Sequence, residues 1–129
     1  MRIVVTGGAG FIGSHVVDAY VKAGHKVAII DNLTTGFRRN INPRAKFYNA
    51  DVCDTKQIAR IFSLEKPEVV THHAALISVI ESVRSPLPTL NINVLGTANA
   101  LQAFGKSGRG KNKRFIYASS GGAIYGDPK

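Results

Sequence analysis

Three glycines spaced three residues apart, Gly7, Gly10 and Gly13, are the first residues of this chain with the types and spacing to do chemistry. An apolar β-branched run (3–5) precedes them, and a helical pattern begins near Phe11. In such a strand–turn–helix, the first glycine permits a tight turn and the second admits a pyrophosphate close to the backbone. The third lets the helix pack closely, and the helix N-terminus presents its unpaired N–H groups to the anion. The pattern predicts a dinucleotide-binding turn.

Two other interpretations of these glycines stay open at this point. Gly8 and Gly13 match the glycine spacing of the phosphate loop G-x-x-x-x-G-K-[ST], but Ser14 stands where that loop has its lysine. A purely structural turn is the second alternative, because tight turns often need glycine at one or two of these positions. The flanking strand and helix, and an acid at the right distance, favour dinucleotide binding.

That acid is Asp31, which ends a predicted strand over 26–30, about twenty residues past the glycine turn. A carboxylate there can accept both hydroxyls of the adenosine ribose and would repel a 2′-phosphate, so Asp31 predicts NAD rather than NADP. Arg38 and Arg39 keep NADP as an alternative, because arginines beyond this strand can compensate a phosphate. A free, solvated aspartate at a strand end is the other alternative.

Alternating strands and helices must position these residues. The first helix is predicted to pack through a stripe at 12, 16, 19, 20 and 23. Asp54 and Gln57 resemble a capping pair for a helix that carries apolar residues at 58, 61 and 62 and is ended by the Lys-Pro pair at 66–67. Further strands are expected within 45–52, 68–75 and 114–119, and a longer helix after Pro88 with a stripe at 90, 94, 98 and 101. This order predicts an α/β, Rossmann-type doubly wound parallel sheet with strand order 3-2-1-4-5, and residues 1–129 read as one domain.

The composition of the chain limits the kinds of partner that it is expected to bind. The chain has 129 residues, is 44% hydrophobic and carries a formal net charge of +9. Five of its seventeen basic residues crowd into 106–114 without interleaved aromatic side chains. This distribution favours a solvated connection over a nucleic-acid surface, so we expect no nucleic-acid partner.

Compartment and metal binding follow from the same composition. No apolar run is long enough to cross a bilayer, and Met1 leads directly into the first strand, so we expect a cytoplasmic protein without a membrane partner. The single cysteine, Cys53, suits a reducing compartment. His72 and His73 are neighbours on a predicted strand end, where side chains point to opposite faces, so we expect no metal site.

Taken together, these motifs resemble the extended short-chain dehydrogenase/reductase family, and within it the NAD-dependent epimerases and dehydratases, most of all the UDP-glucose 4-epimerase branch. The resemblance covers the whole chain and rests on 6–15, 31–33, 51–52, 73–75, 93–97 and 119–126. It implies that NAD is bound by Gly7, Gly10, Phe11, Ile12, Gly13, Asp31, Asn32, Asp51, Val52, Ala74, Ala75, Leu76, Asn93 and Ser119. Asp31 and Asn32 would hold the ribose in such an enzyme, and Asp51 and Val52 the adenine.

The resemblance also implies a reaction. Such enzymes epimerise a nucleotide sugar, here a UDP-hexose, by passing a hydride to NAD and returning it to the other face of a transient ketone, and they are expected to be homodimers. A dehydratase or reductase acting on a nucleotide sugar is an alternative within the same family. A non-catalytic NAD-binding module is an alternative from another class.

Two departures from the family pattern concern catalysis. Gly121 occupies the usual Ser/Thr position, so Ser120 is the candidate hydroxyl that polarises the reacting oxygen. Tyr125 and Lys129 have the spacing of the family's Tyr-x-x-x-Lys, but the Gly-Asp-Pro segment between them opposes a helix. We therefore expect the catalytic tyrosine and lysine beyond Lys129, and the chain to be C-terminally incomplete. Alone it would bind NAD weakly without epimerising, and its fifth strand would expose an open, association-prone edge.

Overall fold

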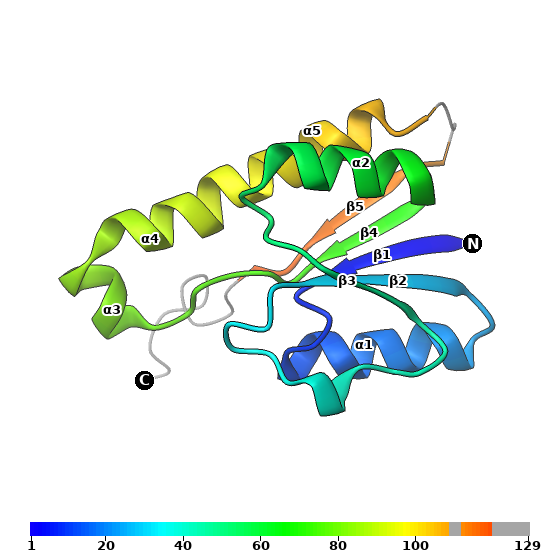
Figure 1. The fold of residues 1–129 in the computed structure, drawn as a ribbon, viewed down its shortest axis with the longest axis horizontal. Coiled ribbons are helices and arrows are strands. Elements are labelled where there is room, and N and C mark those ends of the chain that lie inside the picture. Colours follow the sequence, from blue (N-terminus) through cyan, green and yellow to red (C-terminus); the bar gives the residue numbers. More distant parts are fainter. Residues whose placement is uncertain (109–111, 120–129) are drawn as a thin grey trace, which may run out of the picture.

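A computed structural model describes residues 1–108 and 112–119 of the chain (Figure 1). It contains a five-stranded parallel sheet in the order β3-β2-β1-β4-β5, which confirms the predicted fold class and strand order. The strands are β1 (Arg2–Thr6), β2 (Lys26–Asp31), β3 (Lys46–Asn49), β4 (Val69–His72) and β5 (Arg114–Tyr117). The helices are α1 (Phe11–Lys22), the 3₁₀ turn η1 (Arg38–Asn40), α2 (Thr55–Glu65), α3 (Val79–Arg84), α4 (Pro86–Leu90), the π-helical η2 (Asn91–Gly96) and α5 (Thr97–Lys106).

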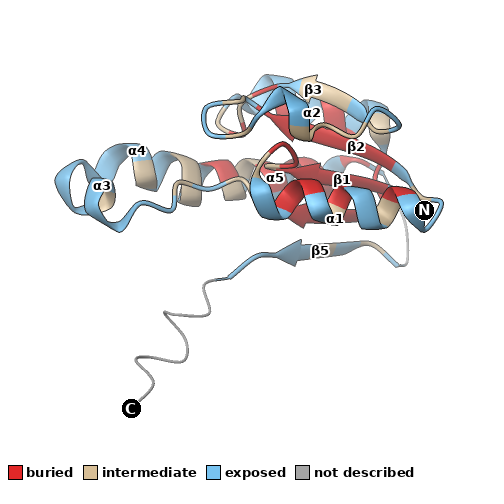
Figure 2. Ribbon diagram, turned by 90° about the horizontal axis from the view of Figure 1, so that it is seen from below, coloured by how far each residue is buried: buried red, intermediate tan, exposed pale blue. Residues whose placement is uncertain are grey.

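Helices cover the sheet on both faces. α2 and α5 lie side by side on one face, and α1 lies on the other (Figure 1). Successive residues of β1 point to opposite faces: Val4 joins the core under α2 and α5, whereas Ile3 and Val5 join the core under α1. β1 and β2 are therefore buried on both faces from their second residue onward, as Figure 2 shows in red, which explains the apolar runs in their sequences.

The packing face of α1 differs from the predicted stripe. Its buried residues are Gly13, Ser14, Val17 and Val21, whereas Ile12 is 65% exposed. The helix is rotated because Gly13 contacts the backbone of the glycine turn, and this contact sets which side faces the sheet. The predicted stripe is therefore displaced by about one residue, although Tyr20 of that stripe is half-buried and packs against the same core.

The long helix also buries a different face from the predicted one. It begins at Pro86, where a proline is tolerated because the first helical N–H needs no partner. Its buried residues are the small Gly96, Ala100 and Ala103, followed by Phe104, which allow α5 to lie close to α2. The predicted stripe at 90, 94, 98 and 101 is exposed instead, and α3 and α4 project from the sheet (Figure 2).

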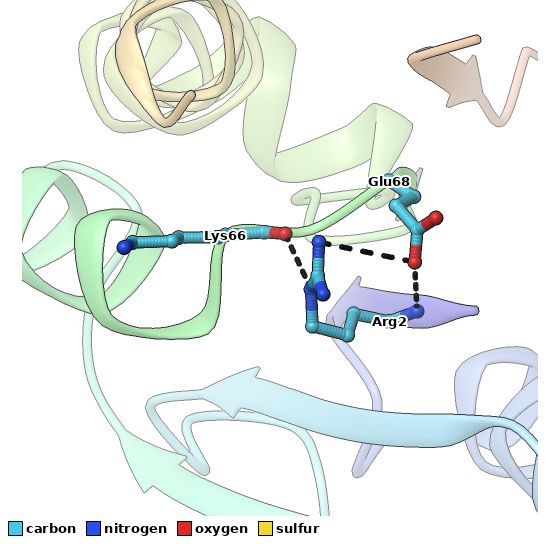
Figure 3. A network of polar contacts seen from close by, with 3 residues as sticks. All are labelled: Arg2, Lys66 and Glu68. Atoms are coloured by element: carbon cyan, nitrogen blue, oxygen red, sulfur yellow. Dashed lines mark hydrogen bonds and ion pairs between the residues drawn. The ribbon is translucent and has the colours of Figure 1, made fainter. Parts of the chain in front are cut away.

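Capping contacts fix α2 and the amino edge of the sheet. The Asp54 side chain accepts a hydrogen bond from the Gln57 N–H, as the predicted cap requires. At the other end, Lys66 adopts φ 44° and its carbonyl accepts from Arg2 Nε at 2.8 Å, while Glu68 accepts from the Arg2 N–H at 2.8 Å (Figure 3). These contacts join α2 to β1 and β4 at the edge opposite the predicted site. No helix in the described ranges is long and apolar enough to cross a membrane.

Candidate functional site

A cleft opens at the carboxyl edge of the sheet, where the strand order reverses between β1 and β4. Nine of the predicted site residues line it: Gly7, Gly10, Asp31, Asn32, Asp51, Val52, Ala74, Ala75 and Leu76. Six further lining residues were not predicted as site residues: Ile30, Thr34, Thr35, Ala50, His73 and Ile92. The ends of β1, β2, β3 and β4 therefore meet at one concave surface, as expected for ligand binding on an open parallel sheet.

At Gly7 and Gly13 the glycine turn makes backbone contacts that leave no room for side chains. Gly7 has φ 68°, and a Cβ added to it would meet the Ala74 nitrogen at 2.7 Å. A Cβ on Gly13 would lie 2.9 Å from the Gly7 carbonyl carbon and closer still to the carbonyl oxygen. A Cβ added to Gly10 would have the Gly7 carbonyl oxygen, at 3.2 Å, as its one neighbour within 4 Å. Gly10 lines the cleft and is open on that side.

The N-terminus of α1 adjoins this turn. Gly10 is its N-cap residue and has no side chain to cap the helix. The first N–H groups of a helix have no acceptor within it, so those of Phe11, Ile12 and Gly13 are available to an anion. The side chains of Phe11 and Ile12 are exposed and do not line the cleft. Only the backbone of these two residues has the placement for such a role.

Asp31 is a buried, oriented carboxylate. Its Oδ2 accepts from the Ala9 N–H at 3.0 Å and its Oδ1 accepts from the Leu33 N–H at 2.8 Å, and the residue is 8% exposed. The alternative of a free, solvated aspartate is therefore wrong. Each oxygen keeps acceptor capacity for a further donor on the cleft side.

The two arginines that kept NADP as an alternative do not line this cleft. Arg38 and Arg39 are exposed in η1, and the Arg39 guanidinium lies 4.7 Å from the centre of the Phe37 ring. At this distance the Arg39 guanidinium makes a cation–π contact with the Phe37 ring. Among the described residues, the cleft therefore presents a carboxylate at the strand end and no guanidinium.

Asp51 and Asn32 form a second polar pair in the cleft. Asn32 Nδ2 donates to Asp51 Oδ2 at 3.0 Å, and the Cys53 N–H donates to Asp51 Oδ1 at 2.8 Å. The Cys53 backbone bond is the main cause that lowers the pKa of Asp51, with the Asn32 bond adding to it. Asp51 is accordingly an ionised acceptor at neutral pH. Beside it, Val52 is buried against Gly96.

Asn93 holds the cleft wall without lining it. Its Oδ1 accepts from the Leu76 N–H at 2.8 Å, and its Nδ2 donates to the Leu76 carbonyl at 2.9 Å. Both backbone groups of Leu76 are thereby satisfied from the π-helical segment η2. Such segments often occur at functional sites, but the hydrophobic pattern of the sequence does not reveal them.

His73 is a cleft residue that the sequence analysis did not place in the cofactor site. Its Nε2 is buried without a hydrogen-bond partner among the described residues, and burial lowers the pKa of the ring. The imidazole is therefore neutral at physiological pH. In the sequence, the only indication that His73 lies in the cleft was its position directly before Ala74, a predicted cofactor-binding residue.

The predicted catalytic residue, Ser120, lies outside the described residues, as do Gly121, Tyr125 and Lys129. Ser119 is exposed after β5 and does not line the cleft. Across 1–108 and 112–119, no group of three His, Cys, Asp or Glu side chains has the arrangement of a metal site.

Comparison with known proteins gives consistent results. The model of the NAD dependent epimerase/dehydratase family matches residues 3–129. A UDP-glucose 4-epimerase of Lactobacillus helveticus is 43% identical over 129 residues, covering 100% of this chain and 38% of the relative. The crystal structure of Thermotoga maritima UDP-glucose 4-epimerase with UDP-glucose shares 46% identity with a TM-score of 0.92, covering 100% of this chain and 41% of that one.

A second similar solved structure is a complex with a cofactor. The Thermus thermophilus UDP-glucose 4-epimerase complex with NAD is 42% identical with a TM-score of 0.92, covering 100% of this chain and 40% of that one. The chain thus spans about 40% of the length of these relatives.

Proposed function

This chain belongs to the NAD-dependent epimerase/dehydratase family, and we propose that it forms the NAD-binding domain of a nucleotide-sugar 4-epimerase acting on UDP-hexoses. The observation that carries the proposal is the convergence of the glycine turn, the oriented Asp31 carboxylate and the Asn32–Asp51 pair on one cleft. The Thermus thermophilus relative that shares this fold is a complex with NAD, which supports the choice of cofactor.

We assign each part of NAD to a group in this chain. The backbone of Gly10 to Gly13, at the positive end of α1, would bind the pyrophosphate. Asp31, with Asn32 beside it, would accept hydrogen bonds from the ribose hydroxyls. Asp51 and Val52 would contact the adenine. The loop from Ala74 to Leu76 would form the wall toward the nicotinamide. When bound, NAD supplies a reversible hydride acceptor.

Calorimetric titration of the 129-residue chain with NAD and, separately, with NADP tests the cofactor part of the proposal. We expect saturable binding of NAD and weaker binding of NADP, because Asp31 repels a 2′-phosphate. A folded chain that binds neither nucleotide, or prefers NADP, would contradict the assignment of the cleft.

The epimerase activity is a proposal about the longer protein, and the relatives named UDP-glucose 4-epimerase support it. Ser120 remains the predicted hydroxyl for the reacting oxygen. The reading frame beyond Lys129 tests this part: a Tyr-x-x-x-Lys on a helical pattern is expected within a few dozen codons, and a stop codon there would favour a non-catalytic module. An assay for interconversion of UDP-glucose and UDP-galactose then tests the substrate.

Homodimer formation and a cytoplasmic location complete the proposal. Large apolar side chains are exposed on α3, α4 and the adjoining η2 and support an association surface: Val79, Ile80, Val83, Leu87, Leu90 and Val94. The single cysteine, Cys53, supports a reducing compartment. Light scattering of the longer protein tests the stoichiometry, and a monomer at micromolar concentration would contradict it.

A further inference from the structure

A buried histidine at the end of β4 connects three elements that surround the cleft. His72 is 2% exposed and does not line the cleft, so its ring does not meet a ligand there directly. Its Nδ1 lies 2.7 Å from Thr6 Oγ1 at the end of β1, and its Nε2 lies 3.0 Å from Thr97 Oγ1 at the start of α5. The ring also stacks on Tyr117 of β5 at 6.0 Å between centroids.

The hydrogen-bond partners determine where the protons lie. The Thr97 hydroxyl donates its single proton to the Asn93 carbonyl at 2.7 Å, so it can only accept from His72. Nε2 of His72 therefore carries the ring proton, and Nδ1 is an acceptor. Thr6 then donates to Nδ1 and keeps a lone pair for the Ala74 N–H, which lies 3.3 Å from Thr6 Oγ1.

These bonds close a ring around the cleft loop. Ala74 is held by Thr6, and Leu76 is held by both side-chain groups of Asn93. His72 joins these two attachments through Thr6 on one side and Thr97 on the other. The loop that lines the cleft is thus fixed at both ends by one directed network.

The polar character of this layer is not required by the core. Thr6 and His72 are register partners across β1 and β4, and two residues earlier the same face carries the register partners Val4 and Val70, which are apolar and fully buried. Buried polar groups add little net stability compared with well-packed apolar ones, but they fix geometry when all partners are satisfied. The polar pair occurs at the strand ends, where the cleft begins.

We propose that His72, as the Nε2–H tautomer, is a positioning residue that sets the Ala74–Leu76 loop and the Thr6 end of the glycine turn for cofactor binding. The effect on affinity rests on the proposed function, whereas the effect on the loop does not. In Thr97→Val the hydroxyl is lost with little change in shape, whereas Thr97→Ser retains it. Thr89→Val, on α4 and outside the network, is the matched control.

Two measurements separate this inference from the cofactor assignment. Thr97→Val should speed amide exchange at Ala74 and Leu76 by about tenfold without a matching change in global unfolding, because the bonds of the Thr97 hydroxyl to His72 Nε2 and to the Asn93 carbonyl are both lost. It should weaken NAD binding by a similar factor, whereas Thr97→Ser and Thr89→Val should stay within about twofold of the original chain. Nitrogen-15 NMR of the imidazole should place the proton on Nε2.

The outcomes are distinguishable. Should the original chain bind no NAD, the proposed function fails, and the exchange and tautomer measurements still decide the role of His72. Should NAD bind equally to the original chain and Thr97→Val with unchanged exchange at Ala74 and Leu76, the positioning role is overturned. A proton found on Nδ1 would overturn it as well.

Discussion

Gly13 packs directly against the backbone of Gly7, so that a Cβ on Gly13 would lie 2.9 Å from the Gly7 carbonyl carbon and overlap its carbonyl oxygen. The obstacle is backbone, which cannot rotate away as a side chain would. The contact therefore couples the rotation of α1 to the shape of the turn.

Replacing this glycine should damage both the fold and the cleft. Gly13→Ala is expected to lower the free energy of unfolding by about 1–3 kcal/mol, the usual cost of overpacking, and to weaken NAD binding. Chemical denaturation and calorimetric titration measure the two effects. Gly105→Ala on the exposed side of α5 is the control, since nothing lies within 4 Å of its added Cβ. It should be neutral or stabilising by up to about 1 kcal/mol, and equal effects of the two substitutions would contradict the proposed contact.

Asp31 should determine which nicotinamide dinucleotide binds. Asp31→Ala is expected to weaken NAD binding and narrow the preference for NAD over NADP, because the ribose acceptor and the charge that repels a 2′-phosphate are both lost. Titration with each nucleotide gives the ratio of dissociation constants. Asp18→Ala on the exposed side of α1 removes the same charge away from the cleft and should leave the ratio unchanged. An unchanged ratio in Asp31→Ala would show that the ribose carboxylate lies elsewhere.

Sequence patterns predicted which residues share the cleft better than they predicted which faces the helices bury. Gly7, Asp31 and Asp51 lie at or just after the ends of strands, and parallel strands bring their carboxyl ends to one edge, so local patterns are enough to predict that these residues lie together. The face that a helix buries depends instead on its neighbours. Gly13 and Gly96 press against other elements, and these contacts rotate the helices away from the most apolar stripes. Such contacts join residues that are distant in sequence, or depend on a turn already formed.

The hydrogen-bond network around His72 was beyond sequence analysis for a similar reason. Thr6, His72 and Thr97 are separated by 66 and 25 residues, and nothing in their local sequence indicates that one imidazole joins two hydroxyls. The π-helical geometry of η2, which places Asn93 opposite Leu76, has no distinct apolar period either.

Gly96 and Val52 should be energetically coupled. A Cβ on Gly96 would lie 2.7 Å from Val52 Cγ2, and valine is confined to few rotamers. Gly96→Ala gains about 1 kcal/mol of helix propensity, but we expect a net loss of stability from overpacking, and weaker NAD binding because Val52 lines the cleft. Val52→Ala should relieve the clash, so the double variant should be more stable than the sum of the single effects. A double-mutant cycle from denaturation measures this coupling, and strict additivity would contradict it.

The stability of the chain should fall with pH below neutrality because of His72. Burial, and then the charge of neighbouring His73, lower the pKa of His72 from 6.5 to about 4. Between these pH values His72 binds a proton in the unfolded chain but not in the folded chain, so the free energy of unfolding decreases as the pH falls through this window. The contribution of His72 to stability is complete only above the window. The full shift in the pKa of His72 corresponds to a loss of about 3 kcal/mol in the free energy of unfolding. Denaturation at about pH 7 and pH 5, above the range of the carboxylates, should show a steeper fall for the original chain than for His72→Phe, whose ring cannot titrate. Equal slopes would mean that His72 titrates as it does in the unfolded chain.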